Sequence, residues 1–375
     1  MATRASTAPV LSNAAVNRAL LARQMLLARA PRPVPDAVRD LVGLQAQAPW
    51  SPYYALWSRL DGFDPHELGA MLTDRRAVRI VVMRGTVHLV TADDCRFLRP
   101  LLAGFLGRGL ATSNWAPGLL DLDLDEVVTV GRDLIEAEPL TFNALGKRLA
   151  ERWTDRDPAT LAQVVRARAP LVQLPPRAVW GQAGQVVVTT AEHWLGGPLT
   201  ADATLDDLVL RYLAAFGPAS VMDVQAWCGL TRLKEVADRL GDRVVRFRNE
   251  AGRELLDLPD APRPDPEVPA PVRFLPDFDN VLLSHADRTR IVGDEARQRL
   301  RSPNGILPGT VLVDGMVAGT WSIERAKAAA TLVVAPFGPL SRADRGAVAD
   351  EGAALLAFGA ADARDHDVRV LDAPG

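Results

Sequence analysis

The chain has 375 residues, which is too long for one ordinary domain and suits two to four small ones. Apolar residues make up 48% and charged residues 24%, so the composition is that of a folded globular protein and excludes a disordered one. The net charge of −3 excludes a protein that coats nucleic acid with its whole surface. It allows a DNA-binding protein whose cations gather on one face.

Features of membrane, secreted and disulfide-rich proteins are absent from the sequence. No apolar run reaches the length of a membrane span, and the first residues, Met-Ala-Thr-Arg-Ala-Ser, have no apolar segment behind their arginine. We therefore expect no secretion signal and no membrane partner. Two cysteines far apart in the chain, Cys95 and Cys228, fit a reducing cytoplasm.

The first 115 residues predict a short tail followed by one helical unit. We expect residues 1–11 to be a disordered N-terminus. Residues 12–115 contain helical patterns at 12–30, 35–47, 51–60 and 64–73. A tight hairpin follows, with strands at 78–83 and 86–91 and Arg84-Gly85 as its turn.

Two further units show a similar order of elements. Residues 120–195 predict a helix through Val127, a helix capped by Thr141, a helix starting at Asp157-Pro158, and strands at 171–174 and 186–190. Residues 203–260 predict helices that begin at Thr204, Ser220 and Thr231. Two strands, 243–248 and 253–258, then flank a turn at Gly252.

Three short helices followed by a two-stranded hairpin is the order of a winged helix-turn-helix. Its recurrence predicts three tandem winged-helix units. Residues 261–271, rich in Asp and Pro, predict a linker. Residues 272–375 predict a small C-terminal α+β module wrapped against the third unit, with strands near 272–275, 310–313, 316–322, 330–335 and 367–371 and a helix at about 341–358. The predicted fold class is therefore mainly α with β wings (α+β).

Arginines cluster where winged helices contact phosphates, namely on wings and recognition helices. We expect these clusters to form the DNA-binding face, although a solvated surface with Arg–Asp pairs is the alternative. The clusters are Arg75, Arg76, Arg79 and Arg84 at the first hairpin, Arg232, Arg239, Arg243, Arg246 and Arg248 in the third unit, and Arg288, Arg290, Arg297, Arg299 and Arg301 downstream.

Sequence motifs for bound metals and nucleotides are missing. There is no phosphate-binding Gly-rich loop, no His-Glu-x-x-His and no pair of cysteines for zinc. We therefore expect no metal and no cofactor. A metal site built from Asp277, Asp279, His285 and Asp287 is an alternative, but pairing of these carboxylates with nearby arginines is favoured.

Gln45-Ala46-Gln47 is the motif to which we assign chemistry. On a regular helix the two side chains would diverge by about 200°. Pro49 disfavours a helical Ala48, so we expect a helix to end here and the two amides to converge. An amide both donates and accepts hydrogen bonds, so the pair can hold a water or a sugar oxygen without deprotonating it. From the residues alone, two glutamines that cap a helix at the surface are the favoured interpretation.

Three motifs together resemble the AlkZ/YcaQ family of alkylpurine DNA glycosylases over roughly residues 11–371. They are Gln45-Ala46-Gln47 with Trp50-Ser51-Pro52-Tyr53, the hairpin segment 83–90, and Leu275-Pro276-Asp277-Phe278-Asp279-Asn280 with the segment 285–290. The resemblance implies a C-shaped scaffold of three winged helices with a concave DNA-binding face. It places Gln45 and Gln47, as in the AlkZ-like branch, at the active centre. That branch is associated with self-resistance to crosslinking natural products that alkylate purine N7.

The resemblance implies a monofunctional DNA glycosylase that hydrolyses the N-glycosidic bond of cationic N7-alkylated purines, with bulky adducts and interstrand crosslinks as candidate substrates. Alkylation at N7 makes the purine a good leaving group, so a positioned water and partial negative charge from Gln45 and Gln47 suffice. We expect double-stranded DNA containing alkylated purines as the partner, and a monomer in the bacterial cytoplasm associated with the nucleoid. The expected DNA-binding residues are Arg84, His88, Arg232, Arg243, Arg246, Arg248, His285, Asp287 and Arg288.

Two other classes share these features. A winged-helix transcriptional regulator without catalysis would have the same arginines but should carry an effector domain or a dimerisation helix. A protein that uses winged helices to dock other proteins would not need arginine-rich wings. Release of free base from DNA containing N7-methylguanine distinguishes the glycosylase from both.

Overall fold

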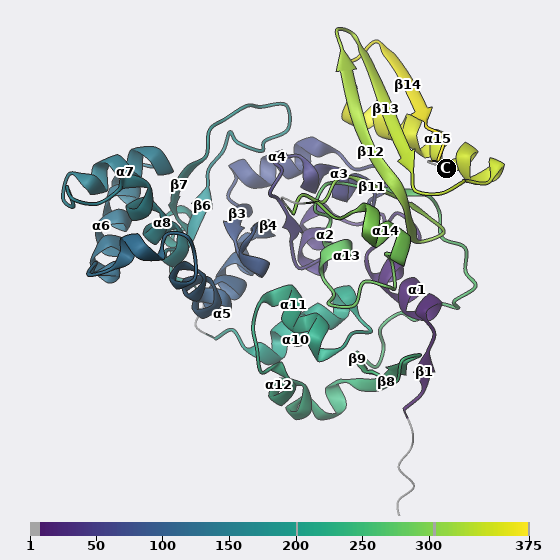
Figure 1. Ribbon diagram of the computed structural model, residues 1–375, viewed down its shortest axis with the longest axis horizontal. Helices are drawn as coiled ribbons and strands as arrows, with labels where there is room; N and C mark the ends of the chain where they lie inside the picture. The colour runs from purple at the N-terminus through teal and green to yellow at the C-terminus, as the bar shows by residue number, and fades with distance from the viewer. Residues whose placement is uncertain (1–7, 200–201, 303–304, 374–375) are drawn as a thin grey trace, which may run out of the picture.

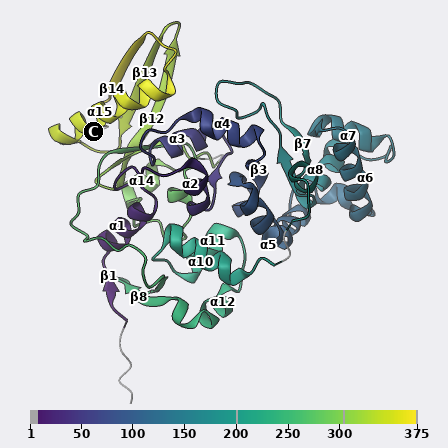
Figure 2. The same ribbon diagram turned by 180° about the vertical axis from the view of Figure 1, so that it is seen from behind.

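The computed structural model describes residues 8–199, 202–302 and 305–373. It has mixed α+β architecture, as expected, and its sheets are three-, five- and six-stranded. Figures 1 and 2 show helices α6 to α8 at one end of the molecule and the strands of the C-terminal sheet at the other, with helices α10 to α12 below the centre. Within the described ranges, no helix is long and apolar enough to cross a membrane.

The first unit contains the expected helices and hairpin. Its helices are α1 (Asn13–Arg23), α2 (Val34–Asp40), α3 (Ser51–Trp57) and α4 (Pro65–Thr73). Strands β3 (Ala77–Val81) and β4 (Val87–Thr91) flank a 3-10 turn, η1 (Met83–Gly85). Both central residues of that turn have positive φ, 56° at Arg84 and 70° at Gly85, which suits the twist of a tight hairpin.

The expected helix over 35–47 is wrong at its C-terminal half. Helix α2 ends at Asp40, and Leu44–Gln45 form the short strand β2. Val42 and Gly43 have φ values of 53° and 83°, in the left-handed region that stops a helix. A Cβ on Gly43 would lie 2.6 Å from Cγ1 of Val90, so packing against β4 leaves room only for glycine. The Gln motif therefore lies in extended chain.

A long helix, α5 (Ala92–Ala111), and the turn η2 (Ala116–Leu119) lead into the second unit. This unit contains α6 (Leu124–Ala137), β5 (Leu140–Thr141), α7 (Phe142–Ala150), α8 (Pro158–Arg168), β6 (Leu171–Gln173), β7 (Val187–Thr190) and α9 (Ala191–Leu195). Its strands join the first hairpin in one sheet of order β2-β4-β3-β6-β7-β5, with Arg79 opposite Gln173. The joining satisfies hydrogen-bonding groups that an isolated hairpin would leave exposed at its edge.

The third unit shows the predicted order of elements. Helices α10 (Leu205–Phe216), α11 (Val221–Cys228) and α12 (Leu233–Arg239) precede the turn η3 (Gly241–Arg243) and the strands β8 (Val245–Asn249) and β9 (Glu254–Asp257). Ser220 and Asp223 form the capping box expected at the start of α11.

The expectation of disorder over residues 1–11 is wrong for its last residues. Val10–Leu11 form β1, which pairs in parallel with the exposed edge of β8. Residues 1–7 lie outside the described part of the chain. Residues 261–271 contain no helix or strand, in agreement with the predicted linker.

The C-terminal module has the predicted strands and helix. It contains β10 (Arg273–Leu275), α13 (Asn280–Leu283), α14 (Asp294–Arg299), β11 (Thr310–Val313), β12 (Met316–Ala326), β13 (Ala329–Pro336), α15 (Arg342–Gly359) and β14 (Asp365–Val370), with the strands in one sheet of that order. The segment after β10 meets the third unit, where the Tyr212 hydroxyl donates to the carbonyl of Ser284 at 2.7 Å. Helix α15 packs on α3 of the first unit, with the rings of Phe358 and Tyr54 5.7 Å apart. The module therefore contacts both the third unit and the first one.

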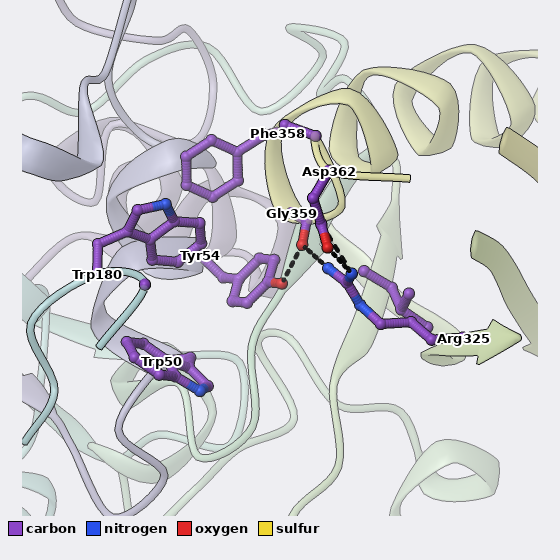
Figure 3. A pocket seen from close by; sticks show the side chains of 10 residues that line it. Trp50, Tyr54, Trp180, Arg325, Phe358, Gly359 and Asp362 are labelled. Atoms are coloured by element: carbon purple, nitrogen blue, oxygen red, sulfur yellow. Dashed lines mark hydrogen bonds and ion pairs between the residues drawn. The ribbon is translucent and has the colours of Figure 1, made fainter. Parts of the chain in front are cut away.

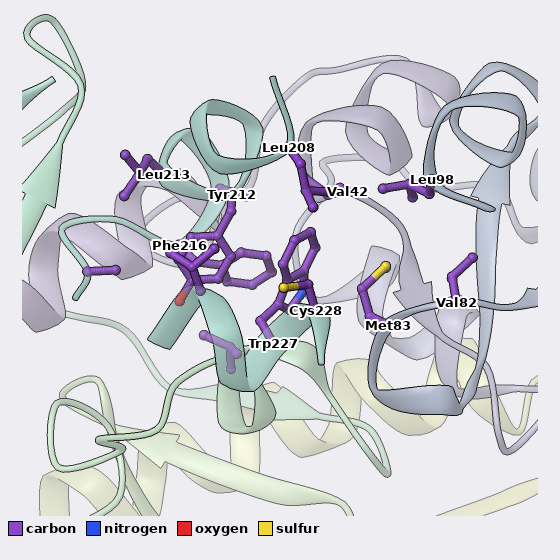
Figure 4. Close-up of a cluster of buried hydrophobic side chains, with 14 of the residues drawn as sticks. Val42, Val82, Met83, Leu98, Leu208, Tyr212, Leu213, Phe216, Trp227 and Cys228 are labelled. Atoms are coloured by element: carbon purple, nitrogen blue, oxygen red, sulfur yellow. The ribbon is translucent and has the colours of Figure 1, made fainter. Parts of the chain in front are cut away.

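The first and third units share one hydrophobic core (Figure 4). Val82 and Met83 at the first hairpin belong to the same buried cluster as Tyr212, Phe216 and Trp227 of α10 and α11. Each of these five side chains is less than 1% exposed. The hairpin turn is thus fixed against the third unit by apolar packing.

A buried ion pair joins the first unit to the C-terminal module. Arg59, just after α3, donates to both carboxylate oxygens of Asp279 at 2.8 Å each, and both side chains are 1% exposed. Asp279 also caps α13 by accepting from the backbone of Val281.

We predict that Arg59→Met lowers the free energy of unfolding by about 3–5 kcal/mol, because it leaves the Asp279 carboxylate buried without its partner. Urea unfolding measures this loss. The control is Arg325→Met, which breaks an exposed pair with Asp362 and should leave stability nearly unchanged. Equal losses in the two variants would contradict a structural role for the buried pair.

Candidate active site at the first hairpin

The two glutamines of the motif both turn toward the first hairpin. Successive residues of an extended chain alternate between two sides, so residues two apart share one side. The Gln45 Oε1 accepts a hydrogen bond from Arg84 Nη2 at 2.6 Å, and the Gln47 Oε1 accepts one from the backbone N–H of Val87 at 3.1 Å. Gln45 is 6% exposed and Gln47 is exposed to solvent. The two amides therefore bind different groups of the hairpin, and convergence on one water stays a prediction.

Arg84 connects three separate segments through one nitrogen atom. Its Nη2 donates to Gln45 Oε1 at 2.6 Å and to Asn280 Oδ1 at 2.9 Å, and lies 3.3 Å from His88 Nε2. Its Nη1 is buried and has no hydrogen-bond partner among the described residues. Burial, with a contribution from the positive charge of Arg288, lowers the pKa of Arg84 to about 10, so the guanidinium stays charged at neutral pH.

His88 is completely buried in the same cluster and is neutral. Its Nδ1 lies 3.0 Å from the carbonyl of Thr86, which only accepts, so Nδ1 carries the proton. Its Nε2 faces Arg84, which only donates, so Nε2 is the acceptor. Burial first, then the charge of Arg84, lower the pKa of His88 to about 3. This imidazole is not available as a general base, because its lone pair is engaged and hidden from solvent.

Asn280 completes the cluster and was not singled out as a site residue from the sequence. Its Nδ2 donates to the carbonyl of Gly43 at 3.0 Å, while its Oδ1 accepts from Arg84. The side chain is 4% exposed and belongs to the first turn of α13. Its position at the end of the motif 275–280 was the available signal. The polar cluster is thus Gln45, Arg84, His88 and Asn280, with Gln47 at its exposed edge.

The loop after α13 places the next three predicted residues differently. Arg288 is exposed, and its Nε faces the carbonyl of His285 at 3.4 Å. Asp287 accepts from the hydroxyl of Thr289 at 2.7 Å. His285 is 2% exposed, faces the Phe216 carbonyl at 2.9 Å, and burial lowers its pKa to about 3. A DNA contact by His285 would require its exposure.

The four predicted arginines of the third unit form a separate surface on α12 and the β8–β9 hairpin. Arg232 is exposed at the start of α12, and Arg248 donates to the carbonyl of Gly252 at 2.8 Å. Arg246 forms an ion pair with Glu254 at 2.7 Å, and Arg243 lies 3.6 Å from Asp207. Two of the four therefore already have carboxylate partners.

The alternative metal site is dispersed in the structure. Asp279 is held by Arg59, Asp287 by Thr289, and His285 faces a backbone carbonyl. In the described ranges, no group of three or more His, Cys, Asp and Glu side chains lies close enough to hold a metal ion.

An aromatic pocket of about 640 Å³ is lined by Trp50, which follows Gln47 by three residues in the chain (Figure 3). Trp50 is 36% exposed, and Trp180 stacks on Phe358 with their ring centroids 5.2 Å apart. Arg325 and Asp362 form an ion pair at 2.8 Å at the same pocket. The sequence did not reveal this pocket, because its rings come from segments more than a hundred residues apart.

A family model described as DNA glycosylase AlkZ-like matches residues 38–358, most of the chain. The chain therefore belongs to the AlkZ-like family of DNA glycosylases.

Among solved structures, the fold is similar to that of the Streptomyces sahachiroi DNA glycosylase AlkZ. The TM-score is 0.78 at 21% sequence identity, and the match covers 96% of this chain and 100% of that one. No curated protein matches the sequence. The structural similarity confirms the predicted fold class.

We predict that the free energy of unfolding falls as the pH is lowered from 6.5 toward 5. Unfolded histidines take up protons near pH 6.5, whereas the buried His88 and His285 stay neutral until the pH approaches 3. Each such group contributes a slope of about 1.4 kcal/mol per pH unit well below pH 6.5. Urea unfolding at several pH values measures the slope.

The variant that tests this assignment is His88→Gln, whose amide can both donate to Thr86 and accept from Arg84. It should reduce the slope, whereas His66→Gln, at an exposed histidine, should leave it unchanged. A slope that is the same in all three proteins would show that His88 does not cause it.

Proposed function

We propose that this chain is a monofunctional DNA glycosylase that hydrolyses the N-glycosidic bond of cationic N7-alkylated purines in double-stranded DNA. The observation that carries the proposal is the chemistry of the polar cluster. Its side chains are amides, one guanidinium and one neutral imidazole, and within the described part of the chain none of their hydrogen-bond partners is a carboxylate. Such a site has no general acid to protonate a leaving base and no general base to activate water.

A cationic purine needs neither group. When water attacks C1′, the bond from C1′ to N9 breaks and its electron pair moves onto the purine, which departs as a neutral base. The water oxygen becomes the hydroxyl of the abasic sugar and its proton passes to solvent. The site has only to position the water and the sugar, because the substrate already carries the positive charge that drives the departure. Undamaged purines, which lack that charge, would be left intact.

The exposure of the two glutamines assigns them different tasks. Gln47 is exposed, and with its Oε1 on the Val87 N–H its amide N–H groups remain to hold the water or a sugar oxygen. Gln45 is buried, and its Oε1 accepts a hydrogen bond that holds the Arg84 side chain in place. Gln47 is thus proposed as the catalytic residue, and Gln45, Arg84, His88 and Asn280 as positioning residues.

DNA binding by the exposed arginines is part of the proposal. Arg232, Arg248 and Arg288 have no carboxylate partner among the described residues and are the strongest candidates for phosphate contacts. Arg243, Arg246 and Asp287 are secondary, because they are engaged within the protein. We leave His285 out of the contacts because it is buried. We expect one monomer per lesion.

Bulky N7 adducts are included among the proposed substrates. An N7 substituent projects into the major groove, so the enzyme can act without enclosing the whole lesion in a closed base pocket. The aromatic pocket at Trp50 is open and lies close along the chain to Gln47. An aromatic substituent could stack there.

We predict that Gln47→Ala slows release of N7-methylguanine by about ten- to a thousandfold under single-turnover conditions, as expected for loss of a positioning group. Its DNA affinity and its Tm should stay near those of the wild type, because the side chain is exposed. Gln185→Ala, at an exposed loop glutamine, is the matched control. A wild-type rate for Gln47→Ala would show that the chemistry occurs elsewhere.

We also predict selectivity for cationic bases. Duplexes that carry one N7-methylguanine should release free base, whereas duplexes with uracil or 8-oxoguanine should not, because the site cannot assist departure of a neutral base. Chromatography of the released bases measures the difference. Efficient uracil excision would refute the mechanism, and tight DNA binding without any base release would favour a non-catalytic regulator.

A further inference from the structure

Buried arginines of this chain fall into two groups. Within the described residues, Arg18, Arg23, Arg59, Arg273 and Arg290 are buried, and each forms an ion pair with a carboxylate. Arg79 and Arg99 are buried to a similar degree, 1% and 4% exposed, but neither forms such a pair within the described ranges. Burying a charge without a partner is costly, so these two arginines need a separate explanation.

Both unpaired arginines line one cleft between the first hairpin and helix α8. The wider part, of about 430 Å³, is lined by Arg84, Arg99 and Arg166, with Trp115 also lining it. An adjoining narrow part, of about 20 Å³, has room for roughly one water-sized group and is lined by Arg79, Arg99 and Arg166. No Asp or Glu lines either part.

The donors in this arginine cleft are poorly satisfied by the protein itself. Arg79 Nη2 donates to the carbonyl of Ala46 at 2.7 Å, but its Nε and Nη1 are buried without a partner among the described residues. Among the described residues, Arg99 donates to two backbone carbonyls, at 3.3 and 3.4 Å. The carboxylate of Glu192 acts on Arg99 through its charge without an ion pair, and Glu192 is itself paired with Arg132. Arg166 is exposed and lies over the Phe142 ring at 5.3 Å.

We propose that the arginine cleft formed by Arg79, Arg84, Arg99 and Arg166 is an anion site that receives a phosphodiester group of the DNA backbone beside the Gln motif. A phosphodiester has two non-bridging oxygens, and guanidinium groups match them with paired N–H donors. One oxygen can enter the narrow part between Arg79 and Arg99 while the chain continues through the wider, open part. This inference rests on the proposed action on DNA.

The position of the cleft gives the bound phosphate a function. Arg84 lines the cleft and also holds Gln45, and Arg79 holds the carbonyl of Ala46 between the two glutamines. A phosphate in the cleft would therefore fix the backbone next to the attacked sugar. Its negative charge would also oppose the local excess of positive charge, which otherwise disfavours a cationic sugar in the transition state.

The test uses Arg166→Gln, because Arg166 is exposed and its replacement should not affect folding. Arg342→Gln is the matched control, since Arg342 is an exposed helical arginine of α15 without an ion pair among the described residues. Fluorescence anisotropy with an undamaged labelled duplex at several salt concentrations gives Kd and its salt dependence. Calorimetry with sodium pyrophosphate at constant ionic strength probes binding of a free anion.

We expect Arg166→Gln to weaken DNA binding about tenfold, as for loss of one charged hydrogen bond, and to lower the slope of log K against log salt by about one. Arg342→Gln should change neither quantity. An unchanged slope and Kd in Arg166→Gln would overturn the proposal. So would pyrophosphate binding that Arg166→Gln abolishes while DNA binding is unaffected, because the cleft would then serve a free anion. Absence of base release by the wild type would refute the proposed glycosylase activity and leave these binding results interpretable.

Discussion

The positive charge of the partly buried Arg84 determines which side chains can contact it beside the Gln motif. Arg84 has φ of 56° and directs its Nη2 at Gln45, His88 and Asn280, from three segments of the chain. A guanidinium only donates, so each neighbour must offer a lone pair. An amide oxygen, the unprotonated nitrogen of a neutral histidine and a second amide oxygen meet this requirement without cancelling the charge. The proposed catalysis without an acid or a base agrees with the same constraint, because a carboxylate here would neutralise Arg84 and a charged histidine would repel it.

The rest of the fold keeps this arrangement rigid. The first hairpin is the middle of a six-stranded sheet, and its turn is buried against α10 and α11 of the third unit. The Arg59–Asp279 pair fixes the start of α13, on which Asn280 lies. Catalysis by positioning depends on such rigidity, because a positioned amide contributes little if it can move. Two surface features adjoin this cluster along the chain. Trp50, three residues after Gln47, lines the aromatic pocket, and Arg84 itself lines the arginine cleft.

Local sequence features predicted most helices, strands and turns. The residues that meet in the polar cluster are determined by contacts between distant parts of the chain. The capping residues of α8, α10 and α11 and the Arg84-Gly85 turn act within a few residues, so they could be read from the sequence. The helix expected to reach Gln47 was wrong because Gly43 packs on Val90, nearly fifty residues away in the chain. Asn280 meets Arg84 across 196 residues, and its role could not be derived from spacing. Within the described ranges Arg79 and Arg99 have no carboxylate partner, and this too is a property of the folded chain alone.

The central claim is that Gln47 holds the attacking water and that Gln45, through Arg84, supports the position in which it does so. The most direct measurement is the single-turnover rate of N7-methylguanine release by Gln45→Ala, Gln47→Ala and the double variant, each with its Tm. If Gln45 acts only by supporting the position in which Gln47 holds the water, the double variant should lose less than the product of the two single losses. Losses that multiply independently would contradict the claim, and wild-type rates in both single variants would remove the motif from the active site.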